Sequence, residues 1–339
     1  MTDSASESSA STDASDSGHS QQQSGQARGC GFWSALIVAA TLGFFVGRGC
    51  RGPVASVASQ RPTDTENNSS EDAVPIVATP DAALAHPLLN RTGPAEMSEV
   101  LQLAEVALAK MEDEVLDYTA NVEMQERVRG KLVPVSTFSL KIRRPQPDRA
   151  DDPGLSAFLH FKTPKEVSDR QVLWMSKRND GKFLVKDSPN SMTWFMPATF
   201  LAPDSLLAMA NARYPITEIG LHTLAKRLIE RGSEDLTRDS TRVELTAGHM
   251  VGNQRTLLIQ VRRATPTGGE NDFSLAEIAI DNQTLLPVRY TAYGWDKDRA
   301  KGEPEDTPPL LESYTYRDLK VNVGLKDTDF DRENSEYRF

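Results

Sequence analysis

The hydrophobic pattern downstream of residue 95 changes its period from that of a helix to that of a strand. Over residues 95–111 the apolar positions recur every three or four residues behind acidic ones, which predicts one amphipathic helix. Over residues 118–128 apolar and polar positions alternate, and the alternation resumes at Phe138 after a turn. Such alternation is typical of antiparallel strands with one wet face. The pattern therefore predicts a helix followed by a long hairpin.

Short apolar or alternating runs between turn residues continue along the chain. They predict strands at residues 157–162, 170–176, 182–186, 241–246, 255–261, 273–280, 286–293 and 311–321. Helical patterns lie between the two groups of strands, around residues 204–210 and from 217 to about 231, where Gly232 is expected to end the helix. This order favours a mainly β (α+β) fold, an incomplete antiparallel β-barrel of about ten or eleven strands closed by helices.

The chain upstream of this pattern has a different composition. Residues 1–29 are mainly Ser, Gln, Asp and Gly, and residues 51–94 are rich in Pro, Ala, Ser and Thr. Neither segment can bury enough apolar surface to offset the entropy of ordering, so we predict a disordered polar tail and a flexible linker. Residues 95–339 remain as one globular domain.

Between the tail and the linker lies an apolar segment, CGFWSALIVAATLGFFVGRGC, at residues 30–50. Its charge-free part, residues 31–47, would form about 25 Å of helix, the lower limit for a membrane span. The long polar stretch before the segment disfavours a signal peptide, and apolar residues on all sides of the helix disfavour a core helix, so we predict a transmembrane anchor. Small residues at 55–59 would still allow a peptidase to cleave the chain there. Arg48, Arg51 and Arg61 follow the charge-free part and only Arg28 precedes it, which favours a cytoplasmic domain.

Composition and motifs disfavour several classes of function. The 339 residues include 38 Lys plus Arg against 48 Asp plus Glu, and this net charge of −10 disfavours nucleic-acid binding. Cys30 and Cys50 both flank the apolar segment, so the domain has no disulfide and no thiol nucleophile. His160 and His222 lack a second ligand at metal-site spacing, and the acidic run from Asp327 lacks the Gly and Glu of a calcium loop. We find no nucleotide-binding or hydrolase motif, and we expect no enzyme activity, cofactor or metal.

Three stretches of the domain resemble a known family. They are residues 117–120 (DYTA), 278–290 (IAIDNQTLLPVRY) and 319–330 (LKVNVGLKDTDF). Together they resemble an uncharacterised bacterial envelope family allied to the LolA/LolB-like lipoprotein-carrier superfamily, over the whole of residues 95–339. The resemblance implies a half-barrel with a helical lid and an apolar cavity, which in the carriers takes up lipoprotein acyl chains in the periplasm. It also implies an inner-membrane protein with a periplasmic domain, and long domains translocate largely regardless of flanking charge.

The domain has a set of aromatic and methionine side chains larger than the packing of one strand requires. Such side chains line adaptable apolar pockets, and an ordinary filled core uses the same residue types. The candidate ligand-binding residues are Phe158, Phe161, Trp174, Met175, Trp194, Phe195 and Met196, with Met209 as a further member of the set. Residues 192–197 are interpreted as a loop where a lid would move.

Two classes of function follow from these expectations. The first is a membrane-tethered envelope binding module whose apolar cavity handles lipid or lipoprotein acyl chains, and it requires a hollow fold. The second is a non-enzymatic protein-interaction or sensor domain with a filled core, an exposed apolar patch and other envelope proteins as partners.

Overall fold

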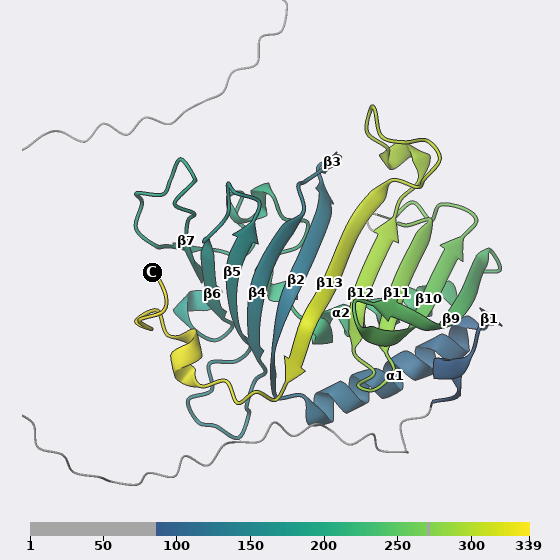
Figure 1. Ribbon diagram of the computed structural model, residues 1–339, viewed down its shortest axis with the longest axis horizontal. Coiled ribbons are helices and arrows are strands. Elements are labelled where there is room, and N and C mark those ends of the chain that lie inside the picture. Colours follow the sequence, from purple (N-terminus) through teal and green to yellow (C-terminus); the bar gives the residue numbers. More distant parts are fainter. Residues whose placement is uncertain (1–85, 270–271) are drawn as a thin grey trace, which may run out of the picture. The chain divides into compact units, whose positions relative to one another are not determined.

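The computed structural model describes residues 86–269 and 272–339 (Figure 1). The predicted tail, the apolar segment at residues 30–50 and the linker up to residue 85 lie outside these residues, so they stay predictions. None of the helices in the described part of the chain combines the length and the apolarity that a bilayer crossing requires.

The fold is built on one antiparallel sheet of thirteen strands. The strands are β1 (Gly93–Ala95), β2 (Asp117–Val128), β3 (Lys131–Leu132), β4 (Ser136–Arg143), β5 (Ser156–Thr163), β6 (Gln171–Met175), β7 (Phe183–Lys186), β8 (Thr199–Leu201), β9 (Thr241–Val251), β10 (Gln254–Arg263), β11 (Leu275–Asp281), β12 (Pro287–Tyr293) and β13 (Leu310–Val321). Their order across the sheet is β1-β9-β10-β11-β12-β13-β2-β4-β5-β6-β7-β8, and β3 pairs with β2.

The sheet is open, because its path ends at β1 and β8 and no ladder within the described residues joins these two strands. The predicted mainly β, antiparallel and unclosed architecture is therefore confirmed. The strand count is higher than predicted because β1, β3 and β8 have only two or three residues each, too few for an alternation to be recognised.

Two α-helices, α1 (Met97–Glu114) and α2 (Leu221–Asp235), pack on one face of this sheet, which we call the inner face. Helix α1 begins where the Glu99 carboxylate accepts a hydrogen bond of 2.9 Å from the backbone N–H of Glu96. Its apolar stripe includes Val100, Leu103 and Met111, which are all buried. The amphipathic pattern recognised at residues 95–111 is thus the face of α1 that covers the sheet.

The structure corrects two of the helix predictions made from the sequence. Gly232 lies inside the helix and does not end it. A Cβ atom at Gly232 would lie 2.8 Å from Leu101 Cδ2 of α1, so the glycine serves the close approach of the two helices. The helix predicted at residues 204–210 is wrong, because this stretch forms turns and one 3₁₀ turn at Ala208–Ala210.

The inner face carries two apolar clusters that meet near the middle of the sheet. The first joins α1 to β9, β10, β11 and β12, with Leu103, Leu245, Leu257, Ile259, Ile278 and Tyr290 among its members. The second joins both helices to β2, β4, β5, β6 and β7, with Met111, Val122, Leu140, Leu159, Trp174 and Leu221 among its members. Leu224 and Tyr314 contact both clusters, so the core is continuous.

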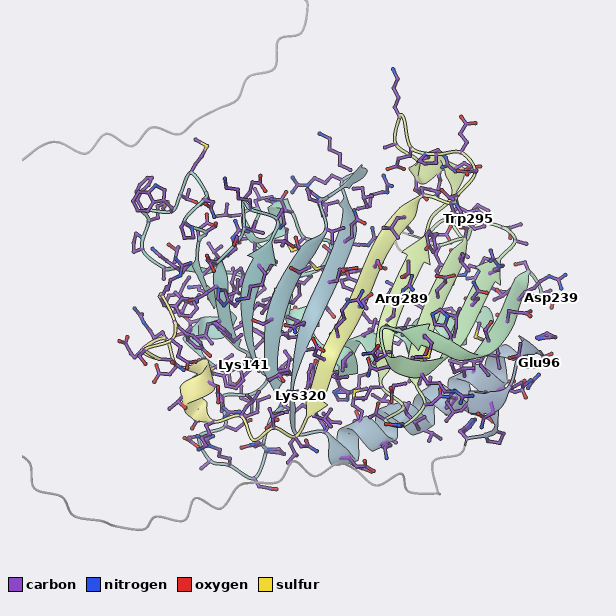
Figure 2. All side chains as sticks on the ribbon, in the orientation of Figure 1. Glu96, Lys141, Asp239, Arg289, Trp295 and Lys320 are labelled. Carbon is purple, nitrogen blue, oxygen red and sulfur yellow. The ribbon has the colours of Figure 1, made fainter. Side chains whose placement is uncertain are left out.

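The C-terminal segment covers part of the opposite, outer face of the sheet. Phe330 and Tyr337 pack there on β5, β6 and β7, and the Tyr337 ring stacks on Phe158 at 4.0 Å between centroids. Lys141 Nζ of β4 lies 2.7 Å from Asp329 Oδ1 and fixes the same segment (Figure 2). Both faces of these strands are therefore partly buried.

We expect the helix–sheet contact to carry much of the stability of the domain. Leu103 has no exposed surface, so Leu103→Ala in the full-length chain should lower the free energy of unfolding by about 2–5 kcal/mol. Val106→Ala is the matched control on α1, because 49% of Val106 is exposed, and it should have little effect. Urea denaturation measures both variants, and equal losses would contradict this packing.

Candidate functional site

The space between the two helices and the inner face of the sheet is small. Between α1, α2 and the sheet lies a cavity of about 80 Å³, with Leu101, Leu228, Ile259, Phe273 and Ile278 among its apolar walls. Pockets that hold small molecules usually measure about 300–1,000 Å³. A chain-like ligand could enter the inner face only if one of its covering elements moved away from the sheet.

A pair of buried carboxylates lies on the same inner face. Glu126 of β2 and Glu312 of β13 are directly opposite each other in the strand pairing, and they are only 4% and 2% exposed. Like charges in this position repel each other, and buried charges are costly unless they are paired. The surrounding groups must therefore compensate for both carboxylates.

Compensation comes first from the crossover, residues 187–220, which leads from β7 through the short edge strand β8 to α2. The backbone N–H of Arg213 donates to Glu126 Oε2 at 2.8 Å, and the Tyr214 hydroxyl donates to Glu312 Oε1 at 3.1 Å. The Arg213 guanidinium lies 3.8 Å from Glu312 Oε2. These contacts attach the crossover to the centre of the sheet.

The second source of compensation is α2. Arg231 Nη1 lies 3.5 Å from Glu312 Oε1 and donates to the Tyr290 hydroxyl at 2.8 Å. Arg231 Nη2 donates to the Tyr214 hydroxyl at 3.1 Å, and the Tyr314 hydroxyl donates to Glu126. We call this set the buried carboxylate network; it comprises Glu126, Arg213, Tyr214, Arg231, Tyr290, Glu312 and Tyr314. It joins the crossover, α2 and the middle strands through polar contacts.

The crossover also exposes a large apolar surface. Seven of the fourteen exposed large apolar residues of the described chain lie in it, namely Met192, Trp194, Phe195, Met196, Phe200, Leu206 and Leu207. Residues 188–203 contain no charged side chain. Exposed apolar surface of this density usually marks contact with a ligand, a partner or a membrane. We call residues 192–207 the apolar crossover segment.

Asp187 fixes the start of this segment. Its carboxylate accepts hydrogen bonds from the Ser191 hydroxyl at 2.7 Å, from the backbone N–H of Ser188 and Arg170 Nε at 2.8 Å each, and from the Thr193 hydroxyl. Partial burial raises the pKa of Asp187, but these hydrogen bonds outweigh it and lower the pKa to about 2. The loop that presents Trp194 is thus held by an ionised carboxylate.

The structure separates the candidate ligand-binding residues into three groups. Phe161 and Trp174 belong to the inner cluster, Phe158 and Met175 lie on the outer face beneath the C-terminal segment, and Trp194, Phe195 and Met196 are exposed on the crossover. Strand alternation explains the first separation, because Phe158 and Phe161, like Trp174 and Met175, project to opposite faces. Their role in ligand binding stays a prediction.

Sequence reasoning missed the buried carboxylate network, although one signal was present. Glu126 follows Val122 and Met124 in the phase of β2 that faces the core. A carboxylate at a strand position that faces the core is expected to be buried and to need hydrogen-bond or ion-pair partners. Glu312 likewise shares the inward phase of β13 with Tyr314 and Tyr316, whereas Arg213, on the crossover, carries no such local signal.

The described residues contain no group of three His, Cys, Asp or Glu arranged to hold a metal ion. His160 Nε2 lies 3.2 Å from Asp169, and His222 Nε2 lies 2.9 Å from Glu112. Each of these histidines thus lies beside one carboxylate, which is fewer ligands than a metal site requires.

The fold and this site define an open-sheet domain with a helix-covered apolar face. The sequence profile of the family described as "Protein of unknown function (DUF1571)" matches residues 115–339, and the chain belongs to this family. The predicted membership of an uncharacterised family is confirmed. No curated protein matches the chain.

Three solved structures illustrate the likeness of fold. A DUF1329 family protein from Desulfovibrio piger is 17% identical, with 70% of this chain and 98% of that chain covered and a TM-score of 0.34. Lipoprotein LppX from Mycobacterium tuberculosis is 12% identical, with coverages of 68% and 98% and a TM-score of 0.33. A LolA superfamily protein from Nitrosomonas europaea is 10% identical, with coverages of 67% and 97% and a TM-score of 0.27. At these values the likeness carries no functional argument.

The buried carboxylate network should make stability depend on pH. Burial raises the pKa of Glu126 above its ordinary value of 4.5, and the Glu312 carboxylate acts in the same direction. The folded chain therefore holds the Glu126 proton more tightly than the unfolded chain does. This contribution to stability is fully present below about pH 4.5 and is lost as the pH rises through the higher folded pKa.

Glu126→Gln should flatten this part of the stability curve. Urea denaturation at a series of pH values from about 4 to 8 measures the difference between wild type and variant, which should change with pH in the direction given above. Glu105→Gln, at an exposed position of α1, is the control, and its curve of unfolding free energy against pH should be parallel to that of wild type. Parallel curves for Glu126→Gln as well would contradict the role of this carboxyl.

Proposed function

We propose that the domain is a binding module for an apolar chain, such as a lipid or lipoprotein acyl chain, and that the chain is taken up between the inner face and the crossover. The observation that carries the proposal is the exposed apolar crossover segment, because it belongs to the same connection that covers the inner face. A ligand that reaches the core must pass this cover, and the apolar crossover segment offers it a first contact.

The closed form needs an opening step. The cavity of about 80 Å³ is too small for an acyl chain, so uptake has to displace the crossover or a helix. The contacts of Arg213 and Tyr214 with the two carboxylates are polar, so water can replace them once the crossover lifts. The apolar side chains underneath would then be covered by the ligand.

Photocrosslinking tests uptake directly. The full-length chain is incubated with a fatty acid that carries a diazirine at the end of its chain, irradiated and digested, and the labelled peptides are mapped by mass spectrometry. We expect labels on inner-face strands, such as the peptides that contain Ile259 and Ile278, as well as on the crossover. Replacing Trp194 and Phe195 by Ala should reduce this labelling about tenfold, because each loses apolar contact area.

Met250→Ala is the matched control for that variant, since Met250 is 52% exposed but lies on β9. It should leave labelling unchanged. The proposal fails if the domain takes no label, or if the control reduces labelling as much as the crossover variant does.

A second candidate is a protein-interaction or sensor domain with a filled core. The small size of the cavity favours it, since the inner face is already packed in this conformation. This function would use the apolar crossover segment as a docking surface. The mapped labels distinguish the two candidates, because labels confined to the crossover favour docking and labels on the inner strands favour uptake.

We also propose that the chain is anchored in the inner membrane by residues 30–50, with the domain on the periplasmic side. The support is the apolar segment itself together with the family resemblance. Protease added to intact spheroplasts should then degrade the domain, while a cytoplasmic marker protein stays intact. Protection of the domain until lysis would favour the cytoplasmic face.

A further inference from the structure

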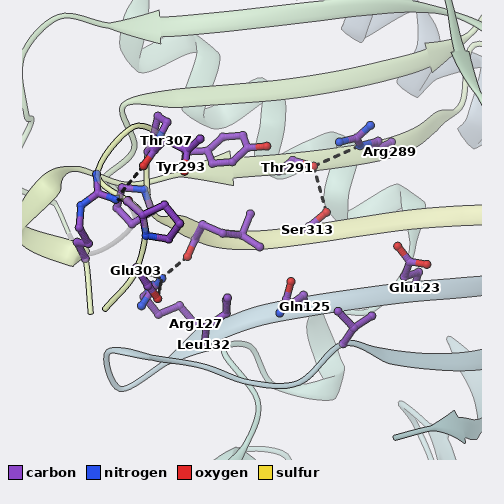
Figure 3. A pocket seen from close by; sticks show the side chains of 16 residues that line it. Glu123, Gln125, Arg127, Leu132, Arg289, Thr291, Tyr293, Glu303, Thr307 and Ser313 are labelled. Carbon is purple, nitrogen blue, oxygen red and sulfur yellow. Dashed lines mark hydrogen bonds and ion pairs between the residues drawn. The ribbon is translucent and has the colours of Figure 1, made fainter. Parts of the chain in front are cut away.

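The outer face of the sheet carries a groove that is separate from the inner site. Its volume is about 440 Å³, within the range of about 300–1,000 Å³ typical of small-molecule pockets (Figure 3). Its floor consists of polar side chains from three neighbouring strands, namely Glu123 and Gln125 of β2, Arg289 and Thr291 of β12, and Ser313 of β13. On the same strands Tyr290 and Tyr314 project the other way, into the core.

One wall of the groove is the connection between β12 and β13, and two arginines hold it in place. Arg127 donates to the Glu303 carboxylate at 2.7 Å and to the Leu310 carbonyl at 2.8 Å. Arg299 donates to the Thr307 carbonyl at 2.8 Å. Because both cations are engaged within the wall, the groove is formed before any ligand arrives.

Strand pairing arranges the floor in rows. Arg289, Thr315 and Glu123 are directly opposite one another across β12, β13 and β2. With strands about 4.8 Å apart, the Cα atoms of Arg289 and Glu123 are about 10 Å apart. The next row consists of Thr291, Ser313 and Gln125. A cation and an anion thus stand on the two outer strands of one row, beside a row of hydroxyl and amide groups.

Among the residues that the structure describes, neither charge has a strong partner. Within the described residues Arg289 makes no ion pair, and its one hydrogen bond is from Nε to the Thr291 hydroxyl at 3.4 Å. Glu123 lies 3.9 Å from Arg317, and both side chains are about half exposed, so this pair contributes little. Glu277, a diagonal neighbour of Arg289, accepts a hydrogen bond from Gln260 at 2.8 Å.

We propose that this outer groove binds a small zwitterion, namely an amino acid or dipeptide with an apolar side chain. Its carboxylate pairs with the Arg289 guanidinium, for which planar two-oxygen acceptors are the preferred partners. Its ammonium group pairs with Glu123. Figure 3 shows these two residues toward one end of the groove and Glu303 and Thr307 toward the other.

The remaining walls fit the rest of such a ligand. Leu132, Tyr293, Pro304 and Pro308 line the groove and offer apolar surface to a side chain. A simple anion fits less well, because Glu123 stands in the same row as Arg289 and the whole chain has a net charge of −10. The ligand class is therefore defined by two opposite charges and an apolar body.

Isothermal titration of the full-length chain with three forms of one probe tests this proposal. The forms are the dipeptide leucyl-alanine, its C-terminal amide and its N-acetyl derivative. We expect the free dipeptide to bind at least about tenfold more tightly than either derivative, because each derivative leaves one protein charge unpaired. Arg289→Gln should remove the preference for the free dipeptide over the amide, and Glu123→Gln should remove the preference over the N-acetyl form.

The control variants carry the same changes outside the groove. Arg262→Gln on β10 and Glu244→Gln on β9 alter exposed residues and should keep both preferences. The proposal is overturned if the free dipeptide does not bind at millimolar concentration. It is also overturned if Arg289→Gln still prefers the free dipeptide to the amide. Because the derivatives test both charges on the wild-type chain, a variant that fails to fold leaves this conclusion intact.

Discussion

The contact between Glu126 and Glu312 imposes a constraint on the whole inner face. Two carboxylates that oppose each other in a buried position need cations and hydroxyl donors from elsewhere in the chain. Arg213 comes from the crossover and Arg231 from α2, so satisfying the pair also fixes the cover of the sheet. The polar network and the apolar core are therefore parts of one arrangement, in which burying the charges orients the elements that bury the apolar surface.

This arrangement separates the two faces of the sheet in their chemistry. The inner face is mainly apolar, holds the buried carboxylate network and is covered by a connection whose outer surface is itself apolar. The outer face carries charged and hydroxyl side chains in a preformed groove beside an anchored loop. The alternation of strands β2, β12 and β13 makes this division unavoidable, because neighbouring residues face opposite sides. One set of strands can thus support two kinds of binding that share no side chain on the sheet.

Local patterns predicted the elements well wherever the period was long enough to be recognised. Helix α1 and strand β2 were found because their apolar residues repeat over many positions. Gly232 was misread as a helix end, since sequence shows a glycine but does not show that Leu101 approaches it. The stretch at residues 204–210 has helical spacing yet forms turns, and the residues that follow it, Arg213 and Tyr214, bind Glu126 and Glu312 of the sheet.

Composition and pattern alone predict a mainly β domain that begins with one helix and has no cysteine, within a chain that is acidic overall. Those properties depend on composition and on periods of two and 3.6 residues, which are local. The long-range contacts follow from the tertiary structure alone, as where the C-terminal segment covers Phe158 on the outer face and where Arg213 meets Glu126 across 87 residues of sequence. These contacts depend on strand order and on the position of the crossover. Both are set by pairing between distant parts of the chain, which a local residue pattern does not encode.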